Sequence, residues 1–170
     1  MEVQIRPIRQ QEISMFWDMF AQVLSTEFPG YSKKVVKFFL EKLYTRVSFG
    51  YWFAHSTKTF LAAAVNDTLV GFAVIDEPYG GVSFCRWLGV TKEYQKKGIG
   101  TKLIEMWIDL ATRSGCHKVE LAAQPEAREF YKKIGLLEEG TREKSYFGID
   151  QYVFGKVIGE PDEMVMIKYT

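Results

Sequence analysis

Apolar residues recur at helical spacing in two stretches near the N-terminus. Residues 12–24 place their apolar side chains three and four positions apart, which predicts a helix with one buried face. Residues 32–44 repeat this period, and Ser32 is a suitable N-cap for them. Ahead of both, residues 3–8 alternate apolar and polar positions and contain Pro7, as an edge strand can. The chain is therefore expected to begin with a strand and two helices.

A run of strands is predicted next. Residues 59–65 and 68–75 are apolar and flank Asn66-Asp67, a pair that tolerates positive φ, so they predict a β-hairpin. After a turn at residues 78–81, the apolar run at residues 82–90 predicts a third strand. These three consecutive strands are expected to be antiparallel.

A strand–helix–strand unit occupies the middle of the chain. Residues 101–113 show the helical period again, and residues 118–123 form a short apolar run. A helical crossover of this kind joins parallel strands in a right-handed sense. Residues 82–90 and 118–123 are therefore expected to run parallel.

One more helix and further strands are predicted in the C-terminal part. Pro125 suits the first turn of a helix at residues 126–134, and Gly135 ends it. Residues 137–170 favour strands, most clearly at residues 163–169.

The order of these elements predicts an α/β fold with a mixed, largely antiparallel sheet of about six to seven strands and helices on both faces. The chain has 170 residues, of which 47% are hydrophobic and 15% aromatic, so it supports a core of its own. No repeat or linker interrupts it, and we expect a single domain over residues 1–170.

Charge and cysteine content narrow the classes of partner. A formal net charge of +1 gives no general attraction to nucleic acid or anionic membrane, so neither is expected as a partner. Cys85 and Cys116 lie in apolar contexts and are expected to be buried free thiols; with only His55 and His117 beside them, no metal site is expected. The chain shows no signal-peptide pattern and no membrane-length apolar window, which favours a cytoplasmic protein.

The most informative motif is Gln-Lys-Lys-Gly-Ile-Gly-Thr, residues 95–101, between a predicted strand and a predicted helix. Backbone amides and two lysines at a helix N-terminus predict a site for a phosphorylated ligand. A Walker loop needs four residues between its glycines, whereas only Ile99 separates Gly98 from Gly100. A dinucleotide fingerprint needs a third glycine where this chain has Leu103. The spacing therefore argues against an enzyme that uses this loop for ATP or NAD.

Two segments resemble the GCN5-related N-acetyltransferase (GNAT) family. Residues 88–103, Leu-Gly-Val-Thr-Lys-Glu-Tyr-Gln-Lys-Lys-Gly-Ile-Gly-Thr-Lys-Leu, are similar to its acetyl-CoA signature, a Val followed by Arg/Gln-x-x-Gly-x-Gly/Ala. Residues 127–136, Ala-Arg-Glu-Phe-Tyr-Lys-Lys-Ile-Gly-Leu, are similar to its Ala-x-x-Phe-Tyr-x-x-x-Gly-Phe segment. The two segments are separated by a predicted strand, as the resemblance requires.

The resemblance implies transfer of an acetyl group from acetyl-CoA to a primary amine by direct attack, with no acyl-enzyme. It implies that the backbone of residues 88 and 90 pairs with the pantetheine arm while the loop amides hold the pyrophosphate. The cofactor site implied in this way comprises Leu88, Gly89, Val90, Gln95, Lys96, Lys97, Gly98, Ile99, Gly100, Thr101, Gln124 and Tyr131.

Tyr131 resembles the general acid of the family, a phenol that gives its proton to the coenzyme A thiolate. The alternative is that Phe130 and Tyr131 are core residues, because they belong to an apolar stripe at i, i+3, i+4 and i+7. Gln124 stands where members often have Asn, and it offers the same amide on a longer arm.

The sequence does not identify the residue that acts as general base. Members with a dedicated base often place a Glu on the strand before the loop, but residues 82–90 contain no carboxylate. Glu120, Glu126 and a chain of water molecules are the open alternatives. The missing carboxylate also leaves a second function open, a non-catalytic module on the same fold that binds or senses acyl-CoA.

The acceptor amine is open as well. Small-molecule amines, polyamines, amino acids and the N-terminus or a lysine of a protein all fit, because a fold does not determine its substrate. Glu27 and Phe28 lie in the link where relatives shape the acceptor site, and Glu138-Glu139 could attract a cationic amine if they are not a solvated turn. The C-terminal strands could also support a homodimer.

Overall fold

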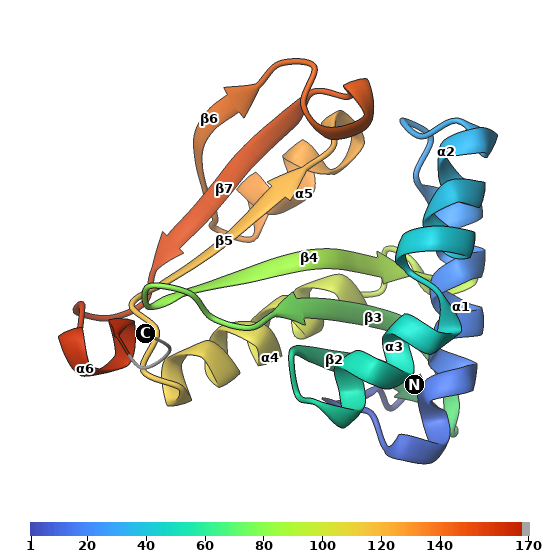
Figure 1. The fold of residues 1–170 in the computed structure, drawn as a ribbon, viewed down its shortest axis with the longest axis horizontal. Helices are drawn as coiled ribbons and strands as arrows, with labels where there is room; N and C mark the ends of the chain where they lie inside the picture. The colour runs from blue at the N-terminus through green and yellow to red at the C-terminus, as the bar shows by residue number, and fades with distance from the viewer. Residues whose placement is uncertain (168–170) are drawn as a thin grey trace. The chain divides into compact units, whose positions relative to one another are not determined.

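The computed structural model describes residues 1–167 and contains a seven-stranded sheet in the order β1-β2-β3-β4-β5-β7-β6 (Figure 1). β4 and β5 are parallel, whereas the pairs β1–β2, β5–β7 and β6–β7 are antiparallel. The predicted mixed, largely antiparallel sheet is thus confirmed. The strands are β1 (Gln4–Pro7), β2 (Lys58–Val65), β3 (Thr68–Asp76), β4 (Val82–Val90), β5 (Lys118–Ala123), β6 (Leu137–Arg142) and β7 (Gln151–Val157).

Helices precede the hairpin and flank β5. They are α1 (Ile13–Glu27), α2 (Lys33–Phe38) continued by a π-helical turn (Phe39–Leu43), α3 (Arg46–Ala54), α4 (Ile99–Arg113), α5 (Arg128–Lys133) and α6 (Glu163–Met166). Short 3-10 turns lie at Gln10–Glu12, Lys92–Tyr94, Pro125–Ala127 and Tyr146–Gly148. None of the helices in the described part of the chain is long and apolar enough to cross a membrane.

The chain divides into two compact units. The first comprises Met1–Ile75 and Trp87–Trp107, and the second comprises Asp76–Arg86 and the chain from Ile108 onward. Each unit has buried residues of its own and is described by itself below. The single domain expected over residues 1–170 stays a prediction.

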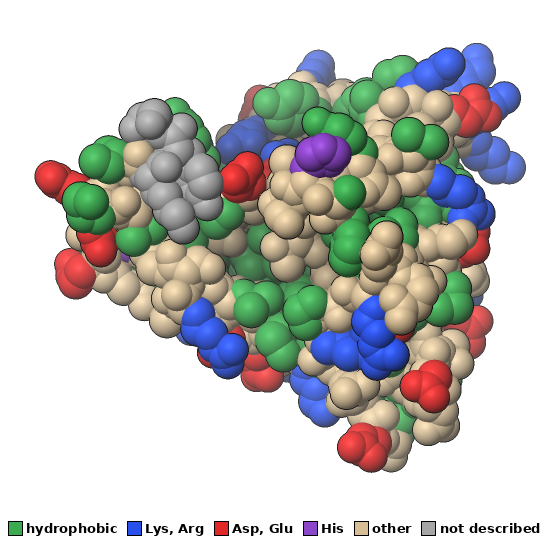
Figure 2. Space-filling view, turned by 60° about the horizontal axis from the view of Figure 1, so that its bottom comes forward, with side chains coloured by type: hydrophobic (Ala, Val, Ile, Leu, Met, Phe, Trp, Pro, Cys, Tyr) green, Lys and Arg blue, Asp and Glu red, His purple; other side chains and the backbone are tan. Residues whose placement is uncertain are grey.

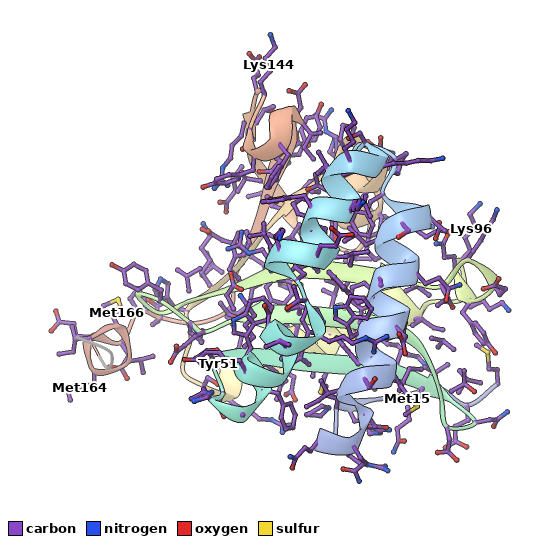
Figure 3. The ribbon with its side chains drawn as sticks, turned by 45° about the vertical axis from the view of Figure 1, so that its right-hand side comes forward. Met15, Tyr51, Lys96, Lys144, Met164 and Met166 are labelled. Atoms are coloured by element: carbon purple, nitrogen blue, oxygen red, sulfur yellow. The ribbon has the colours of Figure 1, made fainter. Side chains whose placement is uncertain are left out.

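In the first unit an aromatic core joins the helices to the sheet. The ring centroid of Phe16 lies 5.4 Å from that of Phe60 on β2 and 5.9 Å from that of Phe72 on β3. α1, α2 and α3 cover this face of the strands (Figure 3). On the other face, a side chain at Gly71 of β3 would come within 3.3 Å of Ile99 and Leu103 of α4. Glycine at this position lets α4 lie close to the sheet.

Several local predictions for the first unit are confirmed. Ser32 caps α2 by accepting a hydrogen bond from the amide of Val35. Asn66 and Asp67 form the hairpin turn with φ of 47° and 62°. The helix α3 was not predicted: Thr45 caps it by accepting from the amide of Ser48. Phe49, Trp52 and Phe53 face the core, but Val47 and Tyr51 are exposed apolar residues, so the helical period is weak in the sequence.

A buried ion pair ties β1 to the start of α1. The guanidinium of Arg6 donates to both carboxylate oxygens of Glu12, at 2.7 and 2.6 Å, and the amide of Arg9 also donates to Glu12. These hydrogen bonds, from Arg6 above all, lower the pKa of Glu12 to about 2. The carboxylate therefore favours the folded state wherever it is ionised.

Replacement of Glu12 by glutamine is expected to destabilise the chain by about 2 kcal/mol at pH 7, because the partly buried guanidinium of Arg6 loses its charged partner. Since the folded pKa is below the unfolded value, this stabilisation is present above about pH 4.5 and disappears as pH falls toward 2. Urea unfolding of the unaltered chain and of Glu12→Gln at pH 7, 4 and 2.5 measures the difference in their free energies of unfolding. A difference in unfolding free energy that does not shrink with falling pH would contradict this role.

In the second unit β5 lies between β4 and β7, and α5 packs against the sheet. The ring of Tyr131 on α5 lies 5.6 Å from that of Phe154 on β7. Cys85 and Cys116 are buried free thiols, as predicted, and burial raises the pKa of Cys116.

The strand predicted at residues 163–169 is wrong where the structure describes it. Residues Glu163–Met166 form the short helix α6, and residues 168–169 lie outside the described part. The side chain of Asp162 accepts a hydrogen bond from the amide of Met164 and so caps the helix. A side chain built at Gly115 would come within 2.8 Å of the side chain of Val165, so Val165 packs closely against this glycine. A cap and one tertiary contact thus override the apolar alternation.

Candidate active site

The glycine loop connects β4 to α4 through a tightly turned backbone. The amide of Thr91 donates to the carbonyl of Val70 on β3 at 2.9 Å, which fixes where the chain leaves the sheet. Lys96 and Gly98 then have positive φ, 58° and 80°. A backbone in which positive-φ residues alternate with ordinary ones can turn neighbouring N–H groups toward a common point, which suits an anion. Residues 95–98 lie between β4 and α4, as predicted, whereas residues 99–101 already form the first turn of α4.

Gly98 marks the open side of this loop. A side chain built on it would meet nothing within 4 Å, although its φ of 80° strains any other residue. The amide of Lys102 donates to the carbonyl of Gly98, which is the first hydrogen bond of α4. The amides of Ile99, Gly100 and Thr101 therefore precede the helical ladder and are available at its positive end.

The loop lysines add local positive charge. Lys96 is exposed and points outward from the loop (Figure 3). Lys97 is also exposed, and its ammonium lies 5.2 Å from the ring centre of Tyr94. On the face drawn in Figure 2, basic and acidic side chains are interspersed, in keeping with the near-neutral net charge. Amides and lysines at residues 96–101 together fit a pyrophosphate group.

Gln95 makes two contacts that the sequence did not indicate. Its side-chain nitrogen donates to the carbonyl of Val90 at 3.0 Å and to the carboxylate of Glu27 at 3.0 Å. The sequence placed Glu27 only in the link between two helices, and these residues are 68 positions apart in the chain. The contact follows from tertiary packing, for which the sequence carries no local signal.

The end of β4 lies under α1. A side chain at Gly89 would come within 2.7 Å of both Val23 on α1 and Phe72 on β3, so only glycine fits there. Leu88 and Val90 alternate with Gly89 and are partly exposed. The parallel ladder between β4 and β5 runs from Val82 to Cys85, so Leu88 and Val90 lie beyond its last pair. Backbone groups at those two positions fit the pairing expected with an extended ligand.

Tyr131 is held in the second unit by aromatic packing. Its side chain is buried, and its ring lies 5.0 Å from that of Phe130 and 5.6 Å from that of Phe154. Burial, with a smaller contribution from Cys85, raises the pKa of Tyr131 well above its usual value. The phenol therefore keeps its proton at ordinary pH, as a proton donor must. The core packing that the apolar stripe predicted is also present.

Gln124 sits at the end of β5, where the 3-10 turn at Pro125–Ala127 begins. It is one of the few buried polar residues, and among the described residues its side-chain oxygen has no hydrogen-bond partner. A buried, unpaired amide oxygen costs free energy unless a ligand donates to it. Gln124 therefore fits a contact with an N–H group of a ligand.

Three carboxylates on β5 and β6, in the second unit, form ion pairs. Glu120 pairs with Lys118 at 3.0 Å, and Lys118 also pairs with Glu139 at 2.8 Å. Glu138 lies on β6 rather than in a turn and pairs with Arg128 at 2.7 Å, which lowers the pKa of its carboxyl. Both Glu120 and Glu138 thus already have a cationic partner within the second unit.

Comparison with known structures shows the same fold in several acetyltransferases. The PaiA N-acetyltransferase of Thermoplasma acidophilum, solved with coenzyme A, superposes with a TM-score of 0.80 at 18% identity, over 93% of this chain and all of that one (100%). An acetyltransferase of the GNAT family from Streptococcus pneumoniae gives a TM-score of 0.74 at 23% identity, over 93% and 100%.

Sequence comparison gives two further matches. A probable glucosamine 6-phosphate N-acetyltransferase 2 of Oryza sativa subsp. japonica is 35% identical over 51 residues, 30% of this chain. This match spans 31%, about a third, of that relative's length. The model of the acetyltransferase (GNAT) family matches residues 17–136, well over half of the chain. With the glycine loop and the Phe-Tyr helix in place, we conclude that this chain belongs to the acetyltransferase (GNAT) family.

Proposed function

We propose that this chain transfers the acetyl group of acetyl-CoA to a primary amine by direct attack, without an acyl-enzyme. The observation that carries the proposal is the loop at residues 96–101, which is open at Gly98 and presents backbone amides and lysines at the start of α4, in a chain of this family. Coenzyme A in the structure of the Thermoplasma relative is in keeping with it. Acetyl-CoA supplies the activated acetyl group.

The loop and the end of β4 bind the cofactor in this proposal. Amides of residues 96–101 donate to the pyrophosphate, assisted by Lys96 and Lys97. Backbone groups of Leu88 and Val90 pair with the pantetheine arm, and the unpaired oxygen of Gln124 accepts from one of its amide N–H groups. A backbone N–H near the end of β4 polarises the thioester carbonyl.

Proton transfer falls to Tyr131. The amine nitrogen forms its bond to the carbonyl carbon while the bond between that carbon and sulfur breaks. Tyr131 donates its phenolic proton to the departing thiolate and regains one from solvent. The amine proton leaves to water, with Glu126, which is exposed in the turn after β5, as the alternative acceptor; Glu120 is held in its ion pair with Lys118. The products are the acetylated amine and free coenzyme A.

A transfer assay tests this proposal. Incubation with acetyl-CoA and a panel of amines is expected to release the coenzyme A thiol and to add one acetyl group to at least one amine. The panel holds glucosamine 6-phosphate, named for the rice relative, a polyamine, amino acids and peptides with a free N-terminus or lysine.

The same assay distinguishes the second candidate function. Binding of acetyl-CoA with no acetylated product from any amine would favour a non-catalytic acyl-CoA-binding module. The absence of a carboxylate on β4, which carries Ser83, Cys85 and Arg86 as its polar side chains, is the observation in favour of that module.

A further inference from the structure

We propose that Glu27 is a positioning residue for the cofactor loop: through the side chain of Gln95 it holds the loop in the shape that receives the pyrophosphate. This role rests on the proposed function, because it concerns the same acetyl-CoA site. The charged group of Glu27 does not contact the pyrophosphate, and Gln95 has only a neutral amide. Glu27 acts from the last turn of α1, outside the family's loop motif.

The chemistry of the contact fixes the orientation of Gln95. The side-chain nitrogen of Gln95 lies 3.0 Å from the carboxylate of Glu27 and 3.0 Å from the carbonyl of Val90. Both partners can only accept hydrogen bonds, so the atom between them must be the NH2 group. Each of its two hydrogens then has one partner, and the side chain bridges α1 to the last residue of β4.

α1 is a firm support for this bridge. Val23 and Glu27 lie one turn apart on the helix, and Val23 packs directly on the backbone of β4 at Gly89. Phe16 and Phe20 of the same helix are fully buried in the aromatic core. The carboxylate of Glu27 therefore has a position that the core of the first unit determines.

The loop needs such a support because its backbone is strained. Lys96 has a φ of 58°, in the left-handed region that is unfavourable for a residue with a side chain. Such a conformation persists only where the surroundings hold it. Gln95 directly precedes Lys96, so its bridge fixes the start of the strained segment that continues to Gly98.

The direction in which acetyl-CoA affinity changes when Glu27 is replaced distinguishes this positioning role from simple charge repulsion. By charge alone, a carboxylate one side chain away from the loop repels a pyrophosphate, and its removal should strengthen binding. A bridge predicts the opposite result for alanine, because the loop loses its support. Glutamine at position 27 keeps an oxygen that accepts from Gln95 but removes the charge, so the two accounts can be compared directly.

The experiment measures the Kd of acetyl-CoA by calorimetry, and amide hydrogen exchange of residues 95–101 in the ligand-free chain. Glu27→Ala is expected to raise the Kd about fivefold to tenfold and to speed exchange in the loop. Glu27→Gln is expected to stay within about twofold of the unaltered chain. Thr26→Ala, a neighbouring exposed residue of α1, is the matched control and should change neither quantity.

A double-mutant cycle completes the test. If the two side chains act as one bridge, Glu27→Ala should add nothing to the loss caused by Gln95→Ala. Tighter or unchanged binding by Glu27→Ala, or additive losses in the double mutant, would overturn the role of Glu27. Failure of the unaltered chain to bind acetyl-CoA would instead overturn the proposed function and this role with it, and loop exchange would still show whether the bridge exists.

Discussion

Replacement of Gly98 by valine is expected to weaken acetyl-CoA binding by at least about 100-fold, that is by about 3 kcal/mol or more. Two effects act together. The φ of 80° at this position disfavours a β-branched residue, so the loop amides rearrange. The new side chain also enters the open space that faces Gly98, where the pyrophosphate is proposed to bind. Calorimetric titration of the variant with acetyl-CoA measures the effect.

Gly80 provides a matched control for this substitution. It has a φ of 58°, and a side chain on it would also meet nothing within 4 Å. Valine at position 80 should therefore lower the unfolding temperature by a similar amount while acetyl-CoA binds as before. Equal loss of binding in both variants would show that backbone strain, and not the pyrophosphate site, explains the result at Gly98.

Tyr131→Phe is expected to lower kcat by about 10-fold to 100-fold and to leave the Kd of acetyl-CoA nearly unchanged. The ring keeps its packing against Phe130 and Phe154, and only the proton donor is lost. Steady-state kinetics and calorimetry on the same preparation separate the two quantities. Tyr146→Phe, at an exposed tyrosine, is the control and should leave both unchanged.

The raised pKa of Tyr131 adds a pH dependence to this prediction. Burial keeps the phenol protonated beyond pH 10, so ionisation of Tyr131 should cause no fall of kcat between pH 7 and 9. The ratio of kcat values for the unaltered chain and Tyr131→Phe should therefore stay constant over this range. An unchanged kcat in Tyr131→Phe would show that Tyr131 is not the proton donor and only packs in the core.

Much of the fold could be predicted because local signals agree with the final packing. Ser32 caps α2, Asn66 and Asp67 form the hairpin turn, and β4 runs parallel to β5 as the helical crossover requires. Each feature depends on residues close together in the chain. The same holds for the glycine loop, whose strand-to-helix position follows from its neighbours.

The missed features depend on contacts between distant residues. α3 carries apolar side chains on its exposed side as well, at Val47 and Tyr51, so its helical period is weak in the sequence. Gly89 is required because a side chain there would come within 2.7 Å of Val23 and Phe72, a proximity that no local pattern reveals. The contact between Glu27 and Gln95 joins residues 68 positions apart. The position of the glycine loop was thus predictable from the sequence, whereas its contact with α1 was not.

Calorimetric titration of the unaltered chain with acetyl-CoA tests the central claim most directly, with ATP as the competing phosphorylated ligand. Binding with a Kd near micromolar, not displaced by ATP, is the result expected of a glycine loop with this spacing in a chain of this family. No heat of binding at about 100-fold higher acetyl-CoA concentrations, or equal binding of ATP, would contradict it.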